Sequence, residues 1–118
     1  MEVKAFADEL LRALAEAEFF DRVALRTEGP IAEGYARVHE GLFLRFYFNA
    51  TTSTIAFALI KEQQRIWGID YDNRRGWHLH PADNPTDHVG IEPLSVSEIV
   101  ARLRNALLKM AGSGDDRP

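Results

Sequence analysis

One segment of the sequence, which begins at Asp70, is dense in side chains that can act as acids, bases or metal ligands: it reads DYDNRRGWHLHP. A turn is predicted at Asn73–Gly76, because asparagine favours turn entry and glycine tolerates the positive φ that hairpin turns often need. Residues two apart on a strand share a face, so Asp70 pairs with Asp72 on one arm and His78 pairs with His80 on the other. If the two faces coincide, the hairpin brings four titratable groups together.

Two kinds of chemistry fit such a group of side chains. Two imidazoles and a carboxylate, here His78, His80 and Asp72, can hold a divalent metal and leave open positions for water, which the metal makes a better nucleophile. Alternatively, the two histidines act as general acid and base on a phosphodiester without a metal, because imidazole titrates near neutral pH. In that case the neighbouring Arg74 and Arg75 hold the phosphate.

A purely structural role for the same residues competes with both chemistries. An aspartate and a histidine across a hairpin often form only a surface pair, worth about 0–1 kcal/mol. The sequence also lacks the longer metal signature H-E-x-x-H. His88, in the loop sequence TDHVG, is a secondary candidate for a third metal ligand, whereas His39 lies beside Glu40 without companion residues and is expected to be solvated.

The elements that position these residues are predicted from hydrophobic periodicity. Apolar residues recur at spacings of three and four near the N-terminus, which predicts an amphipathic helix ending near Phe20. Because no helix intervenes among the extended segments that follow, we expect an α+β fold in which an antiparallel meander of about five strands packs one face against two terminal helices. The extended segments, read from alternating apolar and polar residues, are 23–39 with a turn or bulge at 29–30, 42–49, 55–64, 65–73 and 77–80.

The closing helix has a recognisable start and end. Ser95 and Glu98 match the capping box, in which a hydroxyl and a carboxylate satisfy free backbone N–H groups at the first turn. The stretch before it, residues 81–94, is punctuated by prolines and is predicted to be a surface loop. Residues 112–118 are rich in glycine and charge and are expected to form a flexible tail, which leaves a single domain at residues 1–111.

Composition limits the classes of protein that remain. The chain has 118 residues, of which 46% are hydrophobic and 27% charged, a balance too apolar for intrinsic disorder. It has no cysteine, which excludes disulfides and thiolate metal sites and fits a cytoplasmic location. No apolar run is long enough to cross a membrane, so neither insertion nor export is expected. Because the net charge is -4, the protein is expected to bind nucleic acid only through a local basic patch.

The predicted strand at 42–49 raises the question of a protein partner. It places four large apolar side chains on one face, and it places Phe43 and Tyr47 on the other. Two helices cover only one face of a sheet, so covering both faces requires a partner. We therefore expect a homodimer or a complex with another protein.

Tyr71-Asp72-Asn73, followed after a short gap by His78-x-His80 and by a closing helix that reads LSVSEIVARL, forms a recognisable order of motifs. In this order the chain resembles the TumE-type toxins of bacterial and archaeal toxin–antitoxin pairs, small proteins with a run of strands, a Tyr-Asp-Asn motif and a His-x-His. The resemblance covers about residues 31–108. Asp70 stands where that family commonly has arginine.

The resemblance implies a type II toxin component that is neutralised by a helix-turn-helix antitoxin and acts on RNA as a nuclease. Carried onto this chain, it implies His78, His80, Asp72 and Asn73 as catalytic residues. The residues around the turn, Tyr71, Arg74 and Arg75, are the candidates for substrate contacts. Two further functions remain open from the residues themselves. One is a non-enzymatic binding or homodimerising module, and the other is a small phosphoesterase that depends on a divalent metal.

Overall fold

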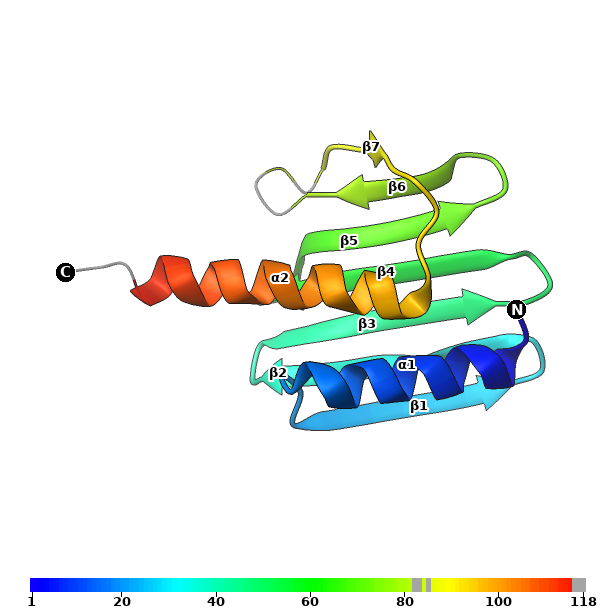
Figure 1. Ribbon diagram of the computed structural model, residues 1–118, viewed down its shortest axis with the longest axis horizontal. Coiled ribbons are helices and arrows are strands. Elements are labelled where there is room, and N and C mark those ends of the chain that lie inside the picture. The colour runs from blue at the N-terminus through cyan, green and yellow to red at the C-terminus, as the bar shows by residue number, and fades with distance from the viewer. Residues whose placement is uncertain (82–83, 85, 116–118) are drawn as a thin grey trace.

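The computed structural model describes residues 1–81, 84 and 86–115. In these residues a helix at each end, α1 (Val3–Ala17) and α2 (Val96–Asp115), flanks one antiparallel sheet. The strands follow one another across the sheet in sequence order, and both helices lie on the same face (Figure 1). The strands are β1 (Arg22–Glu28), β2 (Ile31–His39), β3 (Leu42–Asn49), β4 (Thr54–Lys61), β5 (Gln64–Asp72), β6 (Gly76–His80) and β7 (Val89–Gly90).

The α+β fold with an antiparallel meander is confirmed, although the sheet has seven strands rather than five. One extra strand arises because the turn at Gly29 and Pro30 divides the first extended segment into β1 and β2. The other is β7, which has only two residues and pairs with β6 inside the segment predicted to be loop. Helix α1 ends at Ala17, earlier than Phe20, because Glu18 takes a left-handed conformation that stops the helix.

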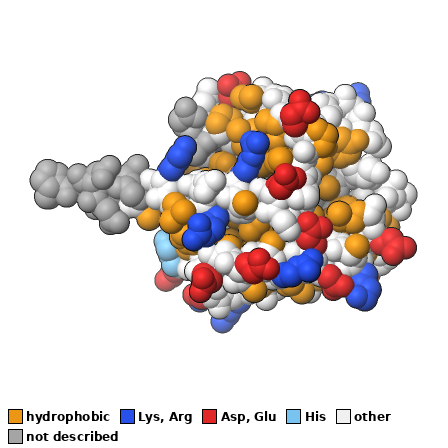
Figure 2. Space-filling view, in the orientation of Figure 1, with side chains coloured by type: hydrophobic (Ala, Val, Ile, Leu, Met, Phe, Trp, Pro, Cys, Tyr) orange, Lys and Arg blue, Asp and Glu red, His pale blue; other side chains and the backbone are white. Residues whose placement is uncertain are grey.

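The hydrophobic core lies between the sheet and the two helices. Phe6 of α1 is fully buried, and its ring stacks on Phe48 of β3 at a centroid distance of 4.5 Å. It also approaches the ring of Phe57 on β4, at 6.2 Å. On the outside of this layer, acidic and basic side chains are interspersed over the helices (Figure 2). Neither helix, over the residues described, is long and apolar enough to cross a membrane.

The predicted capping box at the start of α2 is confirmed. The backbone N–H of Glu98 donates to Ser95 Oγ at 3.1 Å, and the backbone N–H of Ser95 donates to Glu98 Oε1 at 2.7 Å. We expect Ser95→Ala to lower the free energy of unfolding by about 1 kcal/mol, because the N–H of Glu98 then loses its acceptor. Urea denaturation followed by circular dichroism measures this change. An unchanged midpoint would contradict the role of the cap.

The same cap makes part of the stability depend on pH. The backbone N–H and the hydroxyl of Ser95 lower the pKa of Glu98 below its usual value. A carboxyl with a lowered folded-state pKa stabilises the fold above its unfolded pKa and loses that contribution as the pH falls through the folded pKa. The stability difference between wild type and Glu98→Gln should therefore be present at neutral pH and shrink on acidification. A difference independent of pH would contradict this.

Helix α2 continues to Asp115, past the start of the predicted tail at residue 112. Residues 116–118, the rest of that tail, lie outside the described residues. The beginning of the helix is also held by α1, because Glu9 Oε2 accepts hydrogen bonds from the backbone N–H and the hydroxyl of Ser97, at 3.0 and 3.1 Å. The two helices thus lie side by side over the sheet (Figure 1).

The face of the sheet that points away from α1 and α2, called here the open face, carries the residues of functional interest. Strand register aligns them in rows, because side chains of directly paired residues point to the same face. One row runs from β2 to β6 and contains, in order, Tyr35, Arg45, Ala58, Gly68 and His80. The next row contains Glu33, Tyr47, Ala56, Asp70 and His78. The open face therefore joins aromatic side chains on one half of the sheet to histidines on the other.

Candidate functional site

The hairpin of β5 and β6 brings together three of the four titratable side chains predicted to meet there, Asp70, His78 and His80, whereas Asp72 is held at the turn. Asp70 is paired directly with His78, and Gly68 is paired with His80, so the carboxylate and both imidazoles share the open face. The turn between the strands closes through Gly76, whose φ of +72° is in the left-handed region that glycine accepts without strain. Local turn chemistry and strand alternation are thus sufficient to place this group.

The carboxylate of Asp70 lies between the two histidines. Its Oδ2 atom is 3.0 Å from Nε2 of His80 and 3.4 Å from Nε2 of His78. Both histidines are buried, with 2% and 5% of their surface exposed. Burial strengthens electrostatic interactions because water no longer screens them, so this is a stronger arrangement than a surface pair.

The partners of His80 determine which of its nitrogens carries the proton. Nη2 of Arg65 lies 3.4 Å from His80 Nδ1. Because a guanidinium can only donate, Nδ1 is the acceptor, and Nε2 carries the proton that it donates to Asp70. Burial, followed by the positive charge of Arg65, lowers the pKa of His80 below its usual value. Both causes favour the neutral form of His80.

His78 is held from one side only. Its Nδ1 lies 3.2 Å from the carbonyl oxygen of Gly76, which can only accept, so Nδ1 is the protonated nitrogen of the neutral ring. Its Nε2 is buried and has no hydrogen-bond partner among the described residues, because its approach to Asp70 does not meet hydrogen-bond geometry. A buried polar atom without a partner is costly, so this nitrogen is a candidate for binding something else.

His88 completes a group of three imidazoles, called here the histidine cluster: His78, His80 and His88. The ring centroid of His88 is 4.6 Å from that of His80 and 5.5 Å from that of His78. One nitrogen from each of the three rings lies within 4.8 Å of the others. His88 is exposed, and it directly precedes β7. These three residues are the ones that a metal ion would use as ligands.

The other predicted site residues lie around the β5–β6 turn. Asp72 Oδ1 accepts from the backbone N–H groups of Arg74 and Arg75, and its Oδ2 accepts from the Arg75 guanidinium at 3.0 Å. The backbone N–H of Arg75 is the main cause that lowers the pKa of Asp72. These hydrogen bonds hold the Asp72 carboxylate at the turn. The carboxylate that contacts the histidines is that of Asp70.

Asn73 and Tyr71 also make contacts that shape the turn. The amide of Asn73 donates to the backbone carbonyl of Thr52, and its oxygen accepts from the Tyr71 hydroxyl at 3.1 Å. The ring of Tyr71 packs on Trp77. A hollow beside the turn is lined by Thr52, Thr54, Asp72, Asn73, Arg74 and Arg75. The two arginines therefore flank a concave surface at the end of the hairpin, next to Asp72 and Asn73 rather than to the histidines.

Two contributors to the site were missed by sequence reasoning. In the pairing of β4 with β5, Leu59 is the partner of Trp67 and Ile60 is the partner of Arg65, so the register shifts between the two pairs. This shift turns the Arg65 side chain toward the open face. Such a bulge re-aims a side chain, and nothing in the local sequence marks it. Gly68 did leave a signal, since glycine inside a strand often marks a close approach. A Cβ on Gly68 would lie 2.9 Å from the carbonyl oxygen of Phe57 and 3.5 Å from the ring of His80.

Comparison of the chain with protein-family models, with curated proteins and with solved structures finds no match in any of the three.

Proposed function

We propose that the protein is an RNA-cleaving toxin component of a toxin–antitoxin pair and that the histidine cluster, Asp70 and Arg65 form its active site. The observation that supports this most directly is the half-buried carboxylate of Asp70 in contact with two buried imidazoles, at 3.0 and 3.4 Å, beside a guanidinium. Groups that move protons or hold a metal, placed next to a cation that binds phosphate, are what hydrolysis of a phosphodiester requires.

Each group has a role in that reaction. The guanidinium of Arg65 is 41% exposed, so a phosphate can reach it, and its planar set of donors suits two phosphate oxygens. His88 is exposed at the edge of the site, where an imidazole can contact substrate. Asp70 orients the ring of His80 through the Nε2–H bond.

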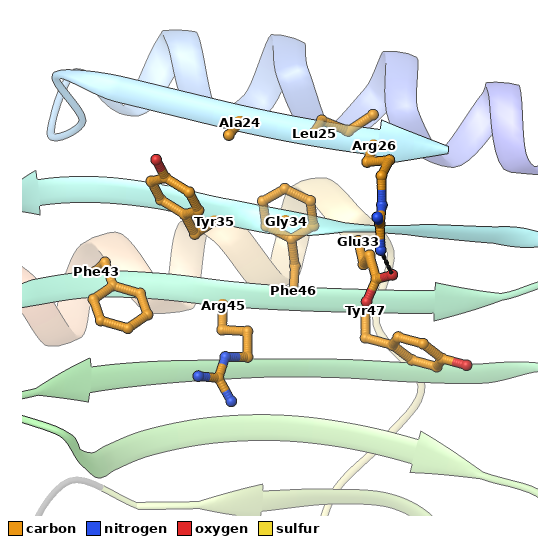
Figure 3. Close-up of a pocket in the computed structure, with 10 residues that line it drawn as sticks. All are labelled: Ala24, Leu25, Arg26, Glu33, Gly34, Tyr35, Phe43, Arg45, Phe46 and Tyr47. Atoms are coloured by element: carbon orange, nitrogen blue, oxygen red, sulfur yellow. Dashed lines mark hydrogen bonds and ion pairs between the residues drawn. The ribbon is translucent and has the colours of Figure 1, made fainter. Parts of the chain in front are cut away.

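RNA is the favoured substrate because of the rest of the open face. The half-buried rings of Phe43 and Tyr47 and the exposed ring of Tyr35 lie on it with Arg45 (Figure 3). Unpaired bases stack on such aromatic side chains, and arginine adds a positive charge. Arg45 takes part in none of the ion pairs formed by the described residues, so its charge is available. From β3 to β6 is roughly 14 Å at the usual strand spacing, a distance that a few nucleotides span.

The assignment to a toxin–antitoxin pair is supported by the Tyr71–Asn73 and His78-x-His80 motifs that resemble TumE-type toxins. The partner proposed on this ground is a helix-turn-helix antitoxin in the cytoplasm. The net charge of -4 makes local charge important for an RNA-directed protein. Arg74 and Arg75 at the turn hollow, together with Arg45 and Arg65 on the open face, supply it.

Induced expression in a tightly repressed host tests the proposal. Wild type is compared with the double variant His78→Ala/His80→Ala, with His88→Ala, and with His39→Ala as a control that removes a histidine outside the cluster. We expect growth arrest and fragmented RNA with wild type and with His39→Ala, and neither with the other two. Because His88 is exposed, His88→Ala separates loss of activity from loss of folding.

Two outcomes would contradict the proposal. The first is arrest that persists in both cluster variants, which would remove the histidines from the activity. The second is the absence of arrest and of RNA cleavage with every form, including purified wild-type protein incubated with RNA.

A second candidate function is protein binding by the open face. The hollow among Tyr35, Arg37, His39, Gly41 and Phe43 is lined mostly by apolar surface, and neither α1 nor α2 lies on this side of the sheet. On this proposal the protein is a homodimerising module in which two open faces pack together. Light scattering tests it: a dimer that dissociates in Phe43→Asp supports this function, and a strict monomer at high concentration contradicts it.

A further inference from the structure

We propose that the histidine cluster binds one divalent transition-metal ion, such as Zn²⁺, through one nitrogen each of His78, His80 and His88, with the carboxylate of Asp70 beside it. This goes beyond the proposed function, because its argument does not use the identity of the substrate. Its ligand set takes His88, the secondary candidate from the sequence, in place of Asp72.

The spacing of the nitrogens is the first observation. One nitrogen from each ring lies within 4.8 Å of the other two. Imidazole ligands bind Zn²⁺ at about 2.0–2.1 Å, so two ligands of a tetrahedral ion lie roughly 3.3 Å apart. His78 and His80 are fixed on the same face of β6, and His88 is exposed, so a small movement of one side chain closes the site around an ion.

The unpartnered Nε2 of His78 is the second and independent observation. Histidines that bind metals commonly donate their other ring N–H to a backbone carbonyl or a carboxylate, which fixes the orientation of the ring. His78 does so through Nδ1 and the carbonyl of Gly76, at 3.2 Å. Its remaining nitrogen, Nε2, is buried, has no hydrogen-bond partner among the described residues, and lies 3.4 Å from Asp70 Oδ2. A cation bound at this nitrogen would supply the missing partner, and the nearby carboxylate would offset part of its charge.

The third observation is the position of the Asp70 carboxylate. This carboxylate lies within 3.4 Å of both buried imidazoles and is 19% exposed, so its negative charge sits next to the proposed ion with little screening. A carboxylate in this position offsets part of the ion's charge. It accepts from Nε2 of His80, so the nitrogen that His80 offers to the ion is Nδ1, which gives up its 3.4 Å contact with the exposed Arg65 guanidinium on binding. The turn carboxylate Asp72 is occupied by the backbone N–H groups of Arg74 and Arg75.

The donors decide the class of metal. Three imidazoles favour Zn²⁺, Co²⁺, Ni²⁺ or Cu²⁺, whereas Mg²⁺ and Ca²⁺ prefer carboxylate, carbonyl and water oxygens. The chain has no cysteine that would compete for such ions. With three protein ligands, the fourth position of a tetrahedral ion stays open to water. His88 and Arg65 are both exposed, so water can reach the edge of the cluster.

The experiment uses the untagged full chain, stripped of metal by a chelator and dialysed, and titrates it with Co²⁺ alone. Visible absorption of Co²⁺ reports low coordination number and nitrogen ligands, and competition with Zn²⁺ gives the affinity for zinc. We expect one ion per chain for wild type and for the control His39→Ala. His88→Ala should raise the Kd at least about tenfold, since even the loss of a residue that supports a ligand costs 10–100-fold.

His88→Ala keeps the inference falsifiable because the substituted side chain is exposed and the variant is expected to fold. The inference is overturned if folded wild type shows no saturable binding of Co²⁺ or Zn²⁺, or if His88→Ala binds as tightly as wild type. Failure of the proposed function looks different. A protein that binds the ion but cleaves no RNA supports the metal site and contradicts the nuclease, whereas cleavage by metal-free protein that binds no ion does the reverse.

Discussion

Replacing Phe6 by alanine is expected to lower the free energy of unfolding by about 3–5 kcal/mol, the usual cost of truncating a buried aromatic residue. Phe6 has no exposed surface, and it joins α1 to the sheet by stacking on Phe48 at 4.5 Å and by its contact with Phe57. The substitution removes the ring from between two other rings, and the surrounding strands cannot collapse into the space it leaves.

The measurement is urea denaturation at low temperature, followed by circular dichroism and by tryptophan fluorescence. Leu11→Ala is the matched control, because Leu11 lies on the same helix but is 43% exposed. Its loss should change stability by much less. Domains of this size have a total stability of about 5–15 kcal/mol, so Phe6→Ala should leave a visibly unfolded fraction in mild denaturant. Equal effects of the two substitutions would contradict the placement of α1 on the sheet.

The parts of the fold that the sequence predicts are those in which a periodic pattern is buried on one side. The eight residues of β3 alternate between the core and the open face, and their burial alternates with them. The start of α2 is marked by two side chains whose hydrogen bonds are local, Ser95 and Glu98. In both cases, all the information lies within a few residues, so a pattern in the sequence is sufficient.

The features that escaped prediction depend on contacts between distant residues. Strand β7 has two residues and pairs with β6 through Val89 and Gly90, which is too short a stretch to show any periodicity. The bulge that brings Arg65 to the open face exists only as a difference in register between β4 and β5. No local sequence pattern indicates strand β7 or the bulge, because the register of a strand is determined by the packing of the whole sheet.

In the candidate site, too, some features follow from local sequence and others do not. The hairpin and the shared face of His78 and His80 follow from a turn signal and from strand alternation, and both are present. Alternation alone places Asp70 and Asp72 on that face equally. What separates them is turn chemistry, because an aspartate at the entry of a tight turn accepts from backbone N–H groups two and three residues later. Asp72 does this with Arg74 and Arg75, which leaves Asp70 to the histidines.

That difference between the two aspartates leads to the prediction with the largest effect on the proposed site. Asp70→Asn keeps the size of the side chain and an oxygen that accepts from His80 Nε2, but it removes the negative charge beside the histidine cluster. We expect the Kd for Zn²⁺ or Co²⁺ to rise about 10–100-fold, as it does when a supporting carboxylate of a metal site is replaced. RNA cleavage that depends on the ion, measured at a metal concentration near the wild-type Kd, should fall about 5–50-fold, because the bound fraction drops from one half to roughly 1–10%.

Asp72→Asn is the matched control, because Asp72 lies two residues away on the same strand and the same face. Its amide oxygen can still accept from the backbone N–H groups of Arg74 and Arg75, so the turn should persist and the metal affinity should stay at the wild-type value. Equal losses of metal affinity in both variants would mean that a general change in local charge is responsible. A loss in Asp72→Asn alone would restore Asp72 to the ligand set and remove Asp70 from it. Only a loss confined to Asp70→Asn agrees with a carboxylate that acts through direct contact with the histidines.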